Sequence, residues 1–195
     1  WLRSPYSVIS AYTAFSDGSY PSGPVSFPTI TVRPALHLNL TSVLFTSDAT
    51  AGSGKSLATA GGALVGATAP TQNLKFTMRN SAQTLVVLAT TAQSTQSGAI
   101  LSFSYAGATM GTNQYVSCAL LDEHGALKYY GKLADSSSAG SGTLSVPLSD
   151  VSDGNYVLKI FSEQTNGDRY TDFASTPIAM TVSVSSGIGT VNGFG

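Results

Sequence analysis

The sequence predicts an all-β protein in which most of the chain forms an antiparallel β-sandwich. Apolar and polar residues alternate in short runs, and Gly- and Asp-containing turns separate the runs. The runs recur about every 8–12 residues, as in all-β folds, and no segment has the apolar period of a helix. The predicted strands cover residues 74–79, 84–88, 99–105, 114–122, 126–133, 143–148, 156–161 and 177–184.

The period-two alternation also predicts which side chains face the interior of the sandwich. A slip of one residue in any strand would turn its whole set outward, so the list tests the strand registers. The predicted core contains Leu101, Phe103, Val116, Cys118, Leu120, Leu144, Val146, Tyr156, Leu158, Ile160, Met180 and Val182.

Residues 1–47 differ from the rest of the chain. The first forty contain five aromatic residues after the opening tryptophan and three closely spaced prolines, which favours short strands and turns. A segment of this size is too short to enclose a core. We therefore expect partial folding with Trp1 exposed, and we expect the alternating residues Leu36, Leu38 and Leu40 to pair with an edge of the sandwich.

Two segments lack any strand pattern. Residues 48–73 consist mostly of small residues with two Gly clusters, which predicts a linker or surface excursion containing at most a weak strand at residues 63–65. Residues 185–195 are again rich in Gly and Ser and predict a flexible tail. These limits confine the sandwich to residues 74–184.

The segment from Leu148 to Tyr156 narrows the fold further. It reads as a crossing between sheets, followed by a tight Asp153-Gly154 turn and a tyrosine at the start of the strongest predicted strand. This is the layout of the tyrosine corner of immunoglobulin-like sandwiches, in which the phenol bonds to nearby backbone. The alternative is an ordinary core tyrosine after a turn. The corner favours an immunoglobulin-like β-sandwich with a partial N-terminal β segment.

Composition excludes several classes of function. The 195 residues carry 9 Lys and Arg against 10 Asp and Glu, for a net charge of -1, which is not the basic footprint of a nucleic-acid binder. No run approaches the roughly 18 apolar residues that a spanning helix needs, so no membrane insertion is expected. Cys118 is the only cysteine, so neither an intrachain disulfide nor a thiolate zinc site can form.

Residues 49–56 satisfy a relaxed phosphate-loop pattern in which Ala49 replaces the first glycine and Lys55-Ser56 closes the motif. A phosphate loop requires a helix that begins at the lysine and binds phosphate with its amides. The following residues have no amphipathic face and reach the Gly61-Gly62 pair within two turns. We therefore expect residues 49–56 to form an exposed, irregular loop without nucleotide.

No other catalytic or metal-binding arrangement is evident. His37 and His124 are interpreted as solvated surface residues, and Cys118 as a small buried hydrophobe. No Gly-x-Ser-x-Gly elbow is present, and no cofactor or metal is predicted. Acids that could share a loop are interpreted as ordinary turn residues, namely Asp150, Asp153, Asp168 and Asp172.

Exposed aromatic rings are the remaining candidate ligand contacts. Tyr129 and Tyr130 are adjacent in a predicted strand, so one ring is expected to face inward and the other outward. A carbohydrate-binding module would need several such rings coplanar on one face. The candidate ligand-facing aromatics are Tyr129, Tyr130, Tyr170 and Phe173.

Six segments carry a resemblance to a known family, namely Trp1–Pro5, Val32–Leu38, Leu40–Ser47, Tyr129–Gly131, Gly154–Lys159 and Phe161–Gln164. They resemble parts of large Firmicutes surface proteins. The N-terminal segment is similar to the end of an uncharacterised domain related to the formylglycine-generating-enzyme and C-type-lectin-like folds, and the later segments look like a joining segment and a downstream immunoglobulin-like module. The resemblance implies that residues 1–47 are the truncated end of a domain that precedes Trp1, and it transfers no catalytic residues.

These observations predict a non-enzymatic extracellular or wall-associated module that acts as a spacer, stalk or adhesion domain in a larger bacterial protein. Its expected partners are a glycan or a protein at the cell surface, and we expect it to be monomeric within the longer chain. The alternative is an accessory carbohydrate-binding module of a secreted glycosidase.

Overall fold

A computed structural model of the chain describes residues 5–7, 10–12, 22–24, 37–50, 52, 54–70, 73–88, 96–168 and 170–194. The chain divides into two compact units, Trp1–Asn39 and Leu40–Gly195. The first unit contains a three-stranded antiparallel sheet, in line with the short strands expected there. The predictions for Trp1 and Leu36 lie outside the described residues. The strands of the first unit are β1 (Pro5–Ser7), β2 (Ser10–Tyr12) and β3 (Ser22–Pro24).

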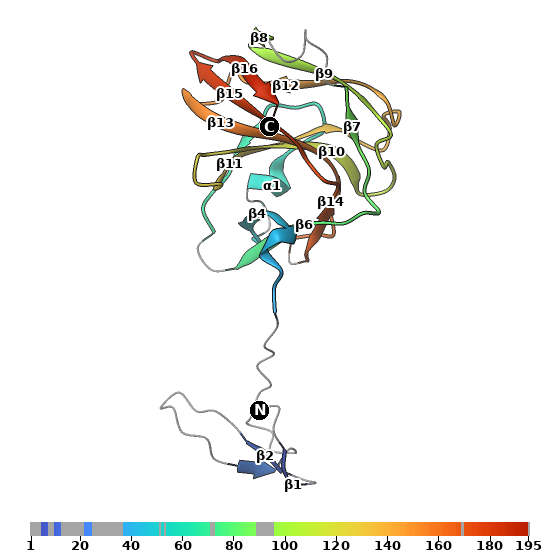
Figure 1. Cartoon of the computed structure of the whole chain (residues 1–195), viewed down its shortest axis with the longest axis vertical. Coiled ribbons are helices and arrows are strands. Elements are labelled where there is room, and N and C mark those ends of the chain that lie inside the picture. The colour runs from blue at the N-terminus through green and yellow to red at the C-terminus, as the bar shows by residue number, and fades with distance from the viewer. Residues whose placement is uncertain are drawn as a thin grey trace. The chain divides into compact units, whose positions relative to one another are not determined.

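The second unit is mostly β, as the sequence predicts, and its strands form two sheets (Figure 1). The smaller sheet is antiparallel, in the order β12-β9-β7. In the larger sheet seven strands are paired in the order β4-β6-β14-β13-β10-β11-β5. The other three form a branch, in which β15 pairs with β13, β16 pairs with β15, and β8 pairs with β16. The pairing of β14 with β6 is parallel, so the larger sheet is mixed.

The bounds of β9 to β13 and of β15 follow the predicted runs closely, whereas β8 and β14 correspond to no predicted run. The small sheet contains β7 (Val86–Val87), β9 (Ile100–Ala106) and β12 (Gly142–Pro147). The large sheet contains β4 (Val43–Asp48), β5 (Val65–Gly66), β6 (Leu74–Arg79), β8 (Ser97–Gly98), β10 (Gln114–Leu121), β11 (Leu127–Ala134), β13 (Gly154–Gln164), β14 (Asp172–Ala174), β15 (Ile178–Ser185) and β16 (Ile188–Phe194). The helical elements are a 3-10 turn at Leu40–Ser42 and α1 at Gly54–Leu57.

The main hydrophobic core lies between the two sheets. Eleven of the twelve predicted core residues are buried, with at most 1% of their surface exposed, and the twelfth, Tyr156, is half-buried and packs against them. The predicted registers are therefore confirmed. At about 25 cal/mol per Å² of apolar surface, burial on this scale is the dominant favourable contribution to folding.

The predicted tyrosine corner is also confirmed. The chain leaves β12 in the small sheet, makes the turns after Leu148, and enters β13 in the large sheet. The Tyr156 hydroxyl then donates a hydrogen bond to the carbonyl oxygen of Ser152, at 3.0 Å. This bond links the start of β13 to the backbone of the crossing.

The interpretation of residues 48–73 as a linker is wrong. Residues 58–67 follow the edge of β11, where the amides of Gly61 and Ala67 donate to carbonyl oxygens of Lys132 and Lys128 at 2.8 and 2.7 Å. Leu64 is buried in the main core. Small residues suit this segment because they let its backbone lie close to the sheet, a reason that composition alone does not separate from flexibility.

The outer face of β10 is covered as well, by a second layer from α1 and β4. Side chains at Val116 through Leu121 are all buried, because even-numbered residues face the main core and odd-numbered ones face this layer. In Figure 1, α1 lies beside β11, with which it is in contact. The layer packs with the strand in a second hydrophobic core made of Leu44, Phe45, Ala58, Ala119, Leu121, Tyr130, Phe161 and Ala174.

Two predicted boundaries are corrected. Strand β4 pairs with β6, so residues 43–47 belong to the second unit and not to the N-terminal segment. Residues 188–194, expected in a flexible tail, form β16 on the edge of β15, where Val191 is 3% exposed. The turn before β16 has positive φ angles at both Ser186 (50°) and Gly187 (74°), which matches the twist of a tight hairpin.

The expected pairing of Leu36, Leu38 and Leu40 with a sheet edge is not observed for the described members of the set. Leu40 is 73% exposed and begins the 3-10 turn that precedes β4. The alternating leucines therefore do not mark a buried strand at Leu40. Leu38 is half-buried outside any strand.

Candidate functional site

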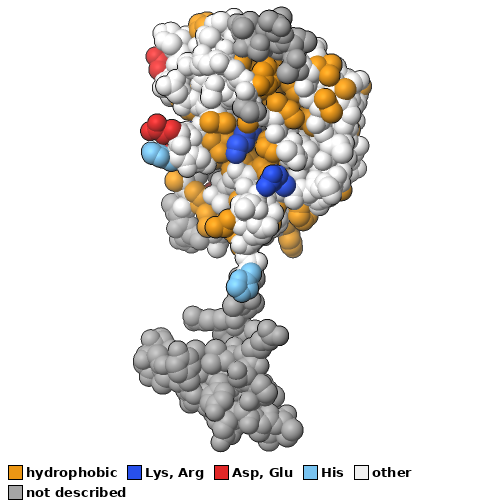
Figure 2. All heavy atoms as spheres, viewed as in Figure 1, with side chains coloured by type: hydrophobic (Ala, Val, Ile, Leu, Met, Phe, Trp, Pro, Cys, Tyr) orange, Lys and Arg blue, Asp and Glu red, His pale blue; other side chains and the backbone are white. Residues whose placement is uncertain are grey.

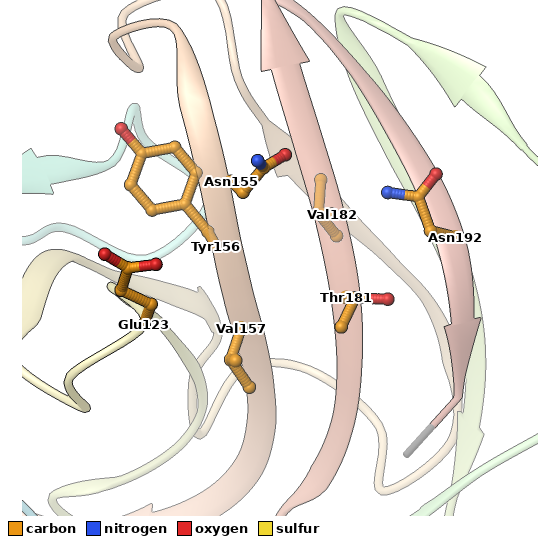
Figure 3. Close-up of a pocket in the computed structure, with 7 residues that line it drawn as sticks. All are labelled: Glu123, Asn155, Tyr156, Val157, Thr181, Val182 and Asn192. Atoms are coloured by element: carbon orange, nitrogen blue, oxygen red, sulfur yellow. The ribbon is translucent and has the colours of Figure 1, made fainter.

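A shallow groove lies over β13, β15, β16 and the β10–β11 turn (Figure 3). Val157 and Thr181 are paired across β13 and β15, so their side chains share one face of the sheet. Figure 3 places Tyr156 and Glu123 on one side of the groove and Asn192 on the other. The groove encloses about 280 Å³ and is lined by Glu123, Asn155, Tyr156, Val157, Thr181, Val182 and Asn192.

Three polar side chains of the groove region form a chain of hydrogen bonds across neighbouring strands. Asn192 Nδ2 donates to Ser183 Oγ at 2.8 Å, and Ser183 Oγ donates to Asn155 Oδ1, also at 2.8 Å. Both asparagines are exposed. Fixed amides of this kind can exchange hydrogen bonds with ligand hydroxyl groups without first being ordered.

The tyrosine corner forms the wall of the groove. The rings of Tyr156 and Tyr129 meet edge to face, with centroids 6.1 Å apart. Tyr129 Oη donates to Ser152 Oγ at 2.9 Å and accepts from the Ser152 amide at 3.0 Å. Burial raises the pKa of Tyr156, and the neighbouring Tyr129 and Asp153 raise it further. Both rings are thus held in place, and a second depression of about 480 Å³ adjoins them.

The four aromatic residues proposed from sequence do not form one platform. Tyr129 lines the second depression and Tyr170 is 69% exposed. Phe173 is half-buried on β14, which β13 and β10 separate from β11. Tyr130 is fully buried, so its assignment as ligand-facing is wrong. Tyr156, which lines the groove, was predicted to be a core residue. The alternation of apolar residues along β13 does not show that a tyrosine at the corner also reaches the surface.

A separate feature, the buried charge cluster, lies at the second core and comprises Lys55, Lys75, Glu163 and Asp172. Lys55 and Lys75 are 6% and 7% exposed, and both carboxylates are fully buried. Lys55 Nζ lies 2.7 Å from Asp172 Oδ2 and also contacts Glu163 Oε1. Lys75 Nζ lies 2.9 Å from the same Asp172 oxygen. Two positive and two negative side chains therefore balance where water is largely excluded.

Neutral groups complete the surroundings of the charge cluster. Lys55 Nζ donates to Thr77 Oγ1 at 2.8 Å and lies 5.3 Å from the ring centroids of both Phe45 and Tyr130. Tyr130 Oη donates to Glu163 Oε2 at 2.9 Å. Burial raises the pKa of Tyr130 well above its ordinary value, and the charge of Glu163 adds to the effect. The phenol therefore stays protonated and remains a donor.

The charge cluster overturns two expectations. Residues 54–57 form the short helix α1 with Lys55 buried, where an exposed loop was predicted. The Lys55 ammonium is bound by carboxylates from β13 and β14, so it is not displayed to a phosphate. Asp172 is not a turn acid, because it begins β14 in the interior. No local pattern distinguishes a buried, paired acid from a solvated one.

The remaining candidates behave as ordinary structural residues. His37 and His124 are exposed, as predicted. Cys118 is buried and unpaired, and burial raises the pKa of its thiol to about 12, which makes it a poor nucleophile. Within the described ranges, no group of three or more His, Cys, Asp or Glu residues is arranged to hold a metal ion.

Comparison with known proteins found no similar family, protein or structure. No family model matches the chain, and no curated protein or solved structure does so either. Among the described residues, no helix is long and apolar enough to cross a membrane.

Proposed function

We propose that the chain is a non-enzymatic extracellular module whose second unit is an immunoglobulin-like β-sandwich, acting as a spacer, stalk or adhesion domain in a larger bacterial surface protein. The observation that carries the proposal is the tyrosine corner at the crossing from β12 to β13. The order of strands supports it, since β12-β9-β7 faces a sheet in which β10, β13 and β15 are neighbours.

The surface supports a structural role over a catalytic one. Charged residues are 10% of the chain, against roughly 25% in ordinary globular domains, and Figure 2 shows few charged side chains on the face in view. The ionisable side chains that do converge, in the charge cluster, are buried and paired with one another. The resemblance to Firmicutes surface proteins supports the extracellular location.

Mechanical unfolding of single molecules tests the proposed role. The full chain is held by its two ends and stretched, and a stalk module should resist until the second unit ruptures in one cooperative step. Gradual lengthening at low force, without a rupture, would contradict the proposal. A rupture that releases only part of the second unit would restrict the stalk role to the part that resists.

The groove favours one alternative, an accessory carbohydrate-binding module. Its fixed asparagines, with the wall ring of Tyr156, are groups that recognise sugar hydroxyls and ring faces. A glycan array probed with the full chain distinguishes the two functions. Binding that Asn155→Ala abolishes and Ser145→Ala leaves intact would favour the carbohydrate module, because Ser145 is an exposed residue of β12 in the other sheet. The stalk proposal predicts no such binding.

A further inference from the structure

The charge cluster places an amine against a carboxyl group in a site from which water is largely excluded. Lys55 Nζ lies 2.7 Å from Asp172 Oδ2, and Glu163 Oε1 touches the same ammonium. Among the described residues, Glu163 Oε1 has no aligned hydrogen-bond donor. A buried carboxylate oxygen that contacts an ammonium without hydrogen-bond geometry is unusual, since buried polar atoms are nearly always paired.

We propose that Lys55 and Asp172 become joined by an amide bond in the folded chain, with Glu163 carrying the protons. Nζ forms a bond to Asp172 Cγ, and the bond from Cγ to Oδ2 breaks. From an ammonium and a carboxylate, one hydrogen remains on the amide nitrogen and two leave with Oδ2 as water. Glu163 accepts protons from Nζ, delivers them to Oδ2, and ends in its starting form, so no other reactant is needed.

The surroundings of Asp172 suit the acceptor role. The Asn166 amide donates to Asp172 Oδ1 at 2.7 Å, which stabilises the negative charge that develops on this oxygen when Cγ is attacked. Oδ2, the oxygen that leaves, lies between the ammonium groups of Lys55 and Lys75. One carboxyl oxygen is thus held by a backbone donor, while the other faces the groups that can protonate it.

Lys55 suits the role of nucleophile better than Lys75 does. Lys75 Nζ also donates to the carbonyl oxygen of Gly167, at 2.7 Å, so it is anchored away from Glu163. Lys55 contacts both carboxylates at once and lies against aromatic rings. Converting a charged pair into a neutral amide and water is favoured in surroundings of low dielectric, and fixed proximity removes most of the entropic barrier to attack.

The released water has a route out. A depression of about 160 Å³ reaches the charge cluster from the surface, and its lining includes Lys55, Lys132, Thr165 and Asp172. Departure of the water through it would make the bond effectively irreversible.

The bond would have a mechanical consequence, which, unlike the bond itself, rests on the proposed stalk function. Lys55 and Asp172 are 117 positions apart. A force applied at the two ends of the chain would pass from α1 directly to β14 and would bypass the residues between them. Residues 56–171 would then be shielded from the load, whereas β4, β15 and β16 lie outside the bridged segment and could still be pulled away. The released length after rupture would be correspondingly short.

Intact mass spectrometry of the purified full chain tests the bond. The expected mass is lower than the sequence mass by one water molecule. Trypsin should no longer cut after Lys55, and the peptide that contains Lys55 should be joined to the peptide that begins at Tyr170. The map is needed because Asp17-Gly18 and Asp153-Gly154 can lose water by cyclising within a single peptide.

Matched variants assign the roles. Lys55→Arg keeps the charge without the nucleophile and should show the full sequence mass, as should Glu163→Gln, which keeps the shape but cannot carry the protons. Lys128→Arg, at an exposed lysine paired with Asp122, should keep the bond. Circular dichroism shows which variants are folded. If a variant does not fold, the tryptic peptide map of the wild-type chain still decides whether the bond is present.

Several outcomes would overturn the proposal. A folded wild-type chain at the full sequence mass excludes the bond, as does water loss confined to a single unlinked peptide. A bridge from Lys75, or one to Glu163, replaces the assignment. Full cross-linking in folded Glu163→Gln removes Glu163 from the chemistry. None of these results bears on the stalk role, which the unfolding experiment tests separately.

Discussion

The two hydrophobic cores of the second unit share the strands β10, β11 and β13 but are built on different physical principles. The main core, between the sheets, is almost entirely apolar, and residues such as Leu158 and Ile160 are fully buried in it. The second core, on the opposite face of the same strands, encloses Glu163 close to Phe161 and receives Lys55 from α1. One strand therefore supports an apolar interior on one face and a charged interior on the other.

The difference teaches how the two layers depend on their sequences. The main core tolerates exchange of one apolar residue for another of similar volume, because burial is non-directional. The charge cluster depends on complete pairing, since removal of one partner leaves an uncompensated buried charge. The second layer is thus the more sensitive of the two to a single substitution, although it is the smaller.

The largest expected effect separates a buried lysine from an exposed one. Whether Lys55 is an ammonium or joined to Asp172 in the proposed amide, Lys55→Ala leaves two buried carboxylates, Glu163 and Asp172, against Lys75 alone. The change should lower the free energy of unfolding by about 3–5 kcal/mol. Urea denaturation measures the change. Lys128→Ala, which removes an exposed partner of Asp122, should leave the unfolding midpoint unchanged. Equal midpoints for the two variants would mean that the charge cluster does not hold the second layer.

The next prediction concerns the main core. Leu158→Ala removes a fully buried side chain from β13 and should cost about 2–5 kcal/mol, the sum of lost burial and the cavity left behind. Leu74→Ala, at a residue that is 56% exposed on β6, is the matched control and should change little. A small loss at Leu158 would show that the main core collapses readily around a cavity.

A glycine tests the contact of residues 58–67 with the sheet. A Cβ at Gly131 would lie 2.4 Å from Leu64 Cδ2, whereas one at Gly66, on the neighbouring strand, would meet nothing within 4 Å. Gly131→Ala should therefore cost about 1–3 kcal/mol by overpacking, and Gly66→Ala should be nearly neutral. Thermal unfolding of both variants provides the measurement. Equal stability would show that Leu64 moves aside freely, and would weaken the assignment of this segment to the core.

A smaller effect is expected at the tyrosine corner. Tyr156→Phe removes the hydrogen bond to the Ser152 carbonyl and should lower the free energy of unfolding by about 1 kcal/mol. Ser152 is exposed, so water can replace part of the lost bond. Tyr170→Phe, at an exposed ring, serves as the control. If the two variants unfold at the same denaturant concentration, the hydrogen bond of the tyrosine corner does not stabilise the fold.

The smallest effect concerns the thiol of Cys118, which is buried in the main core, and it is expected only above pH 9.0. Burial raises the pKa of Cys118 from 9.0 to about 12, so the folded state retains a proton that the unfolded state releases. Its contribution to stability is complete below pH 9 and declines as the pH rises from 9 towards 12. At pH 8 a thiol reagent should label Cys118 only after denaturant is added. Rapid labelling of the native chain would mean that β10 opens locally.

Much of the main core could be predicted because its information is local. Alternation along residues 99–105 and 143–148 assigns each side chain to a face, and the registers follow from it. The Asp153-Gly154 turn before Tyr156 likewise predicted the corner, since both partners of its hydrogen bond lie within five residues.

The charge cluster and the second layer could not be predicted, because they depend on residues far apart in the chain. Lys55 lies in a segment of small residues that resembles a linker, and its partner Asp172 is 117 positions away in a stretch that the sequence predicted as a loop. A charged side chain shows no local sign of burial, since burial becomes tolerable only when an opposite charge arrives through the fold. The sequence by itself determined the strands β9 to β13 and β15, the apolar core and the corner. The tertiary structure decided which further strands join them and which charges are enclosed together, since only folding creates the surroundings of low dielectric and the distant partner that buried charges require.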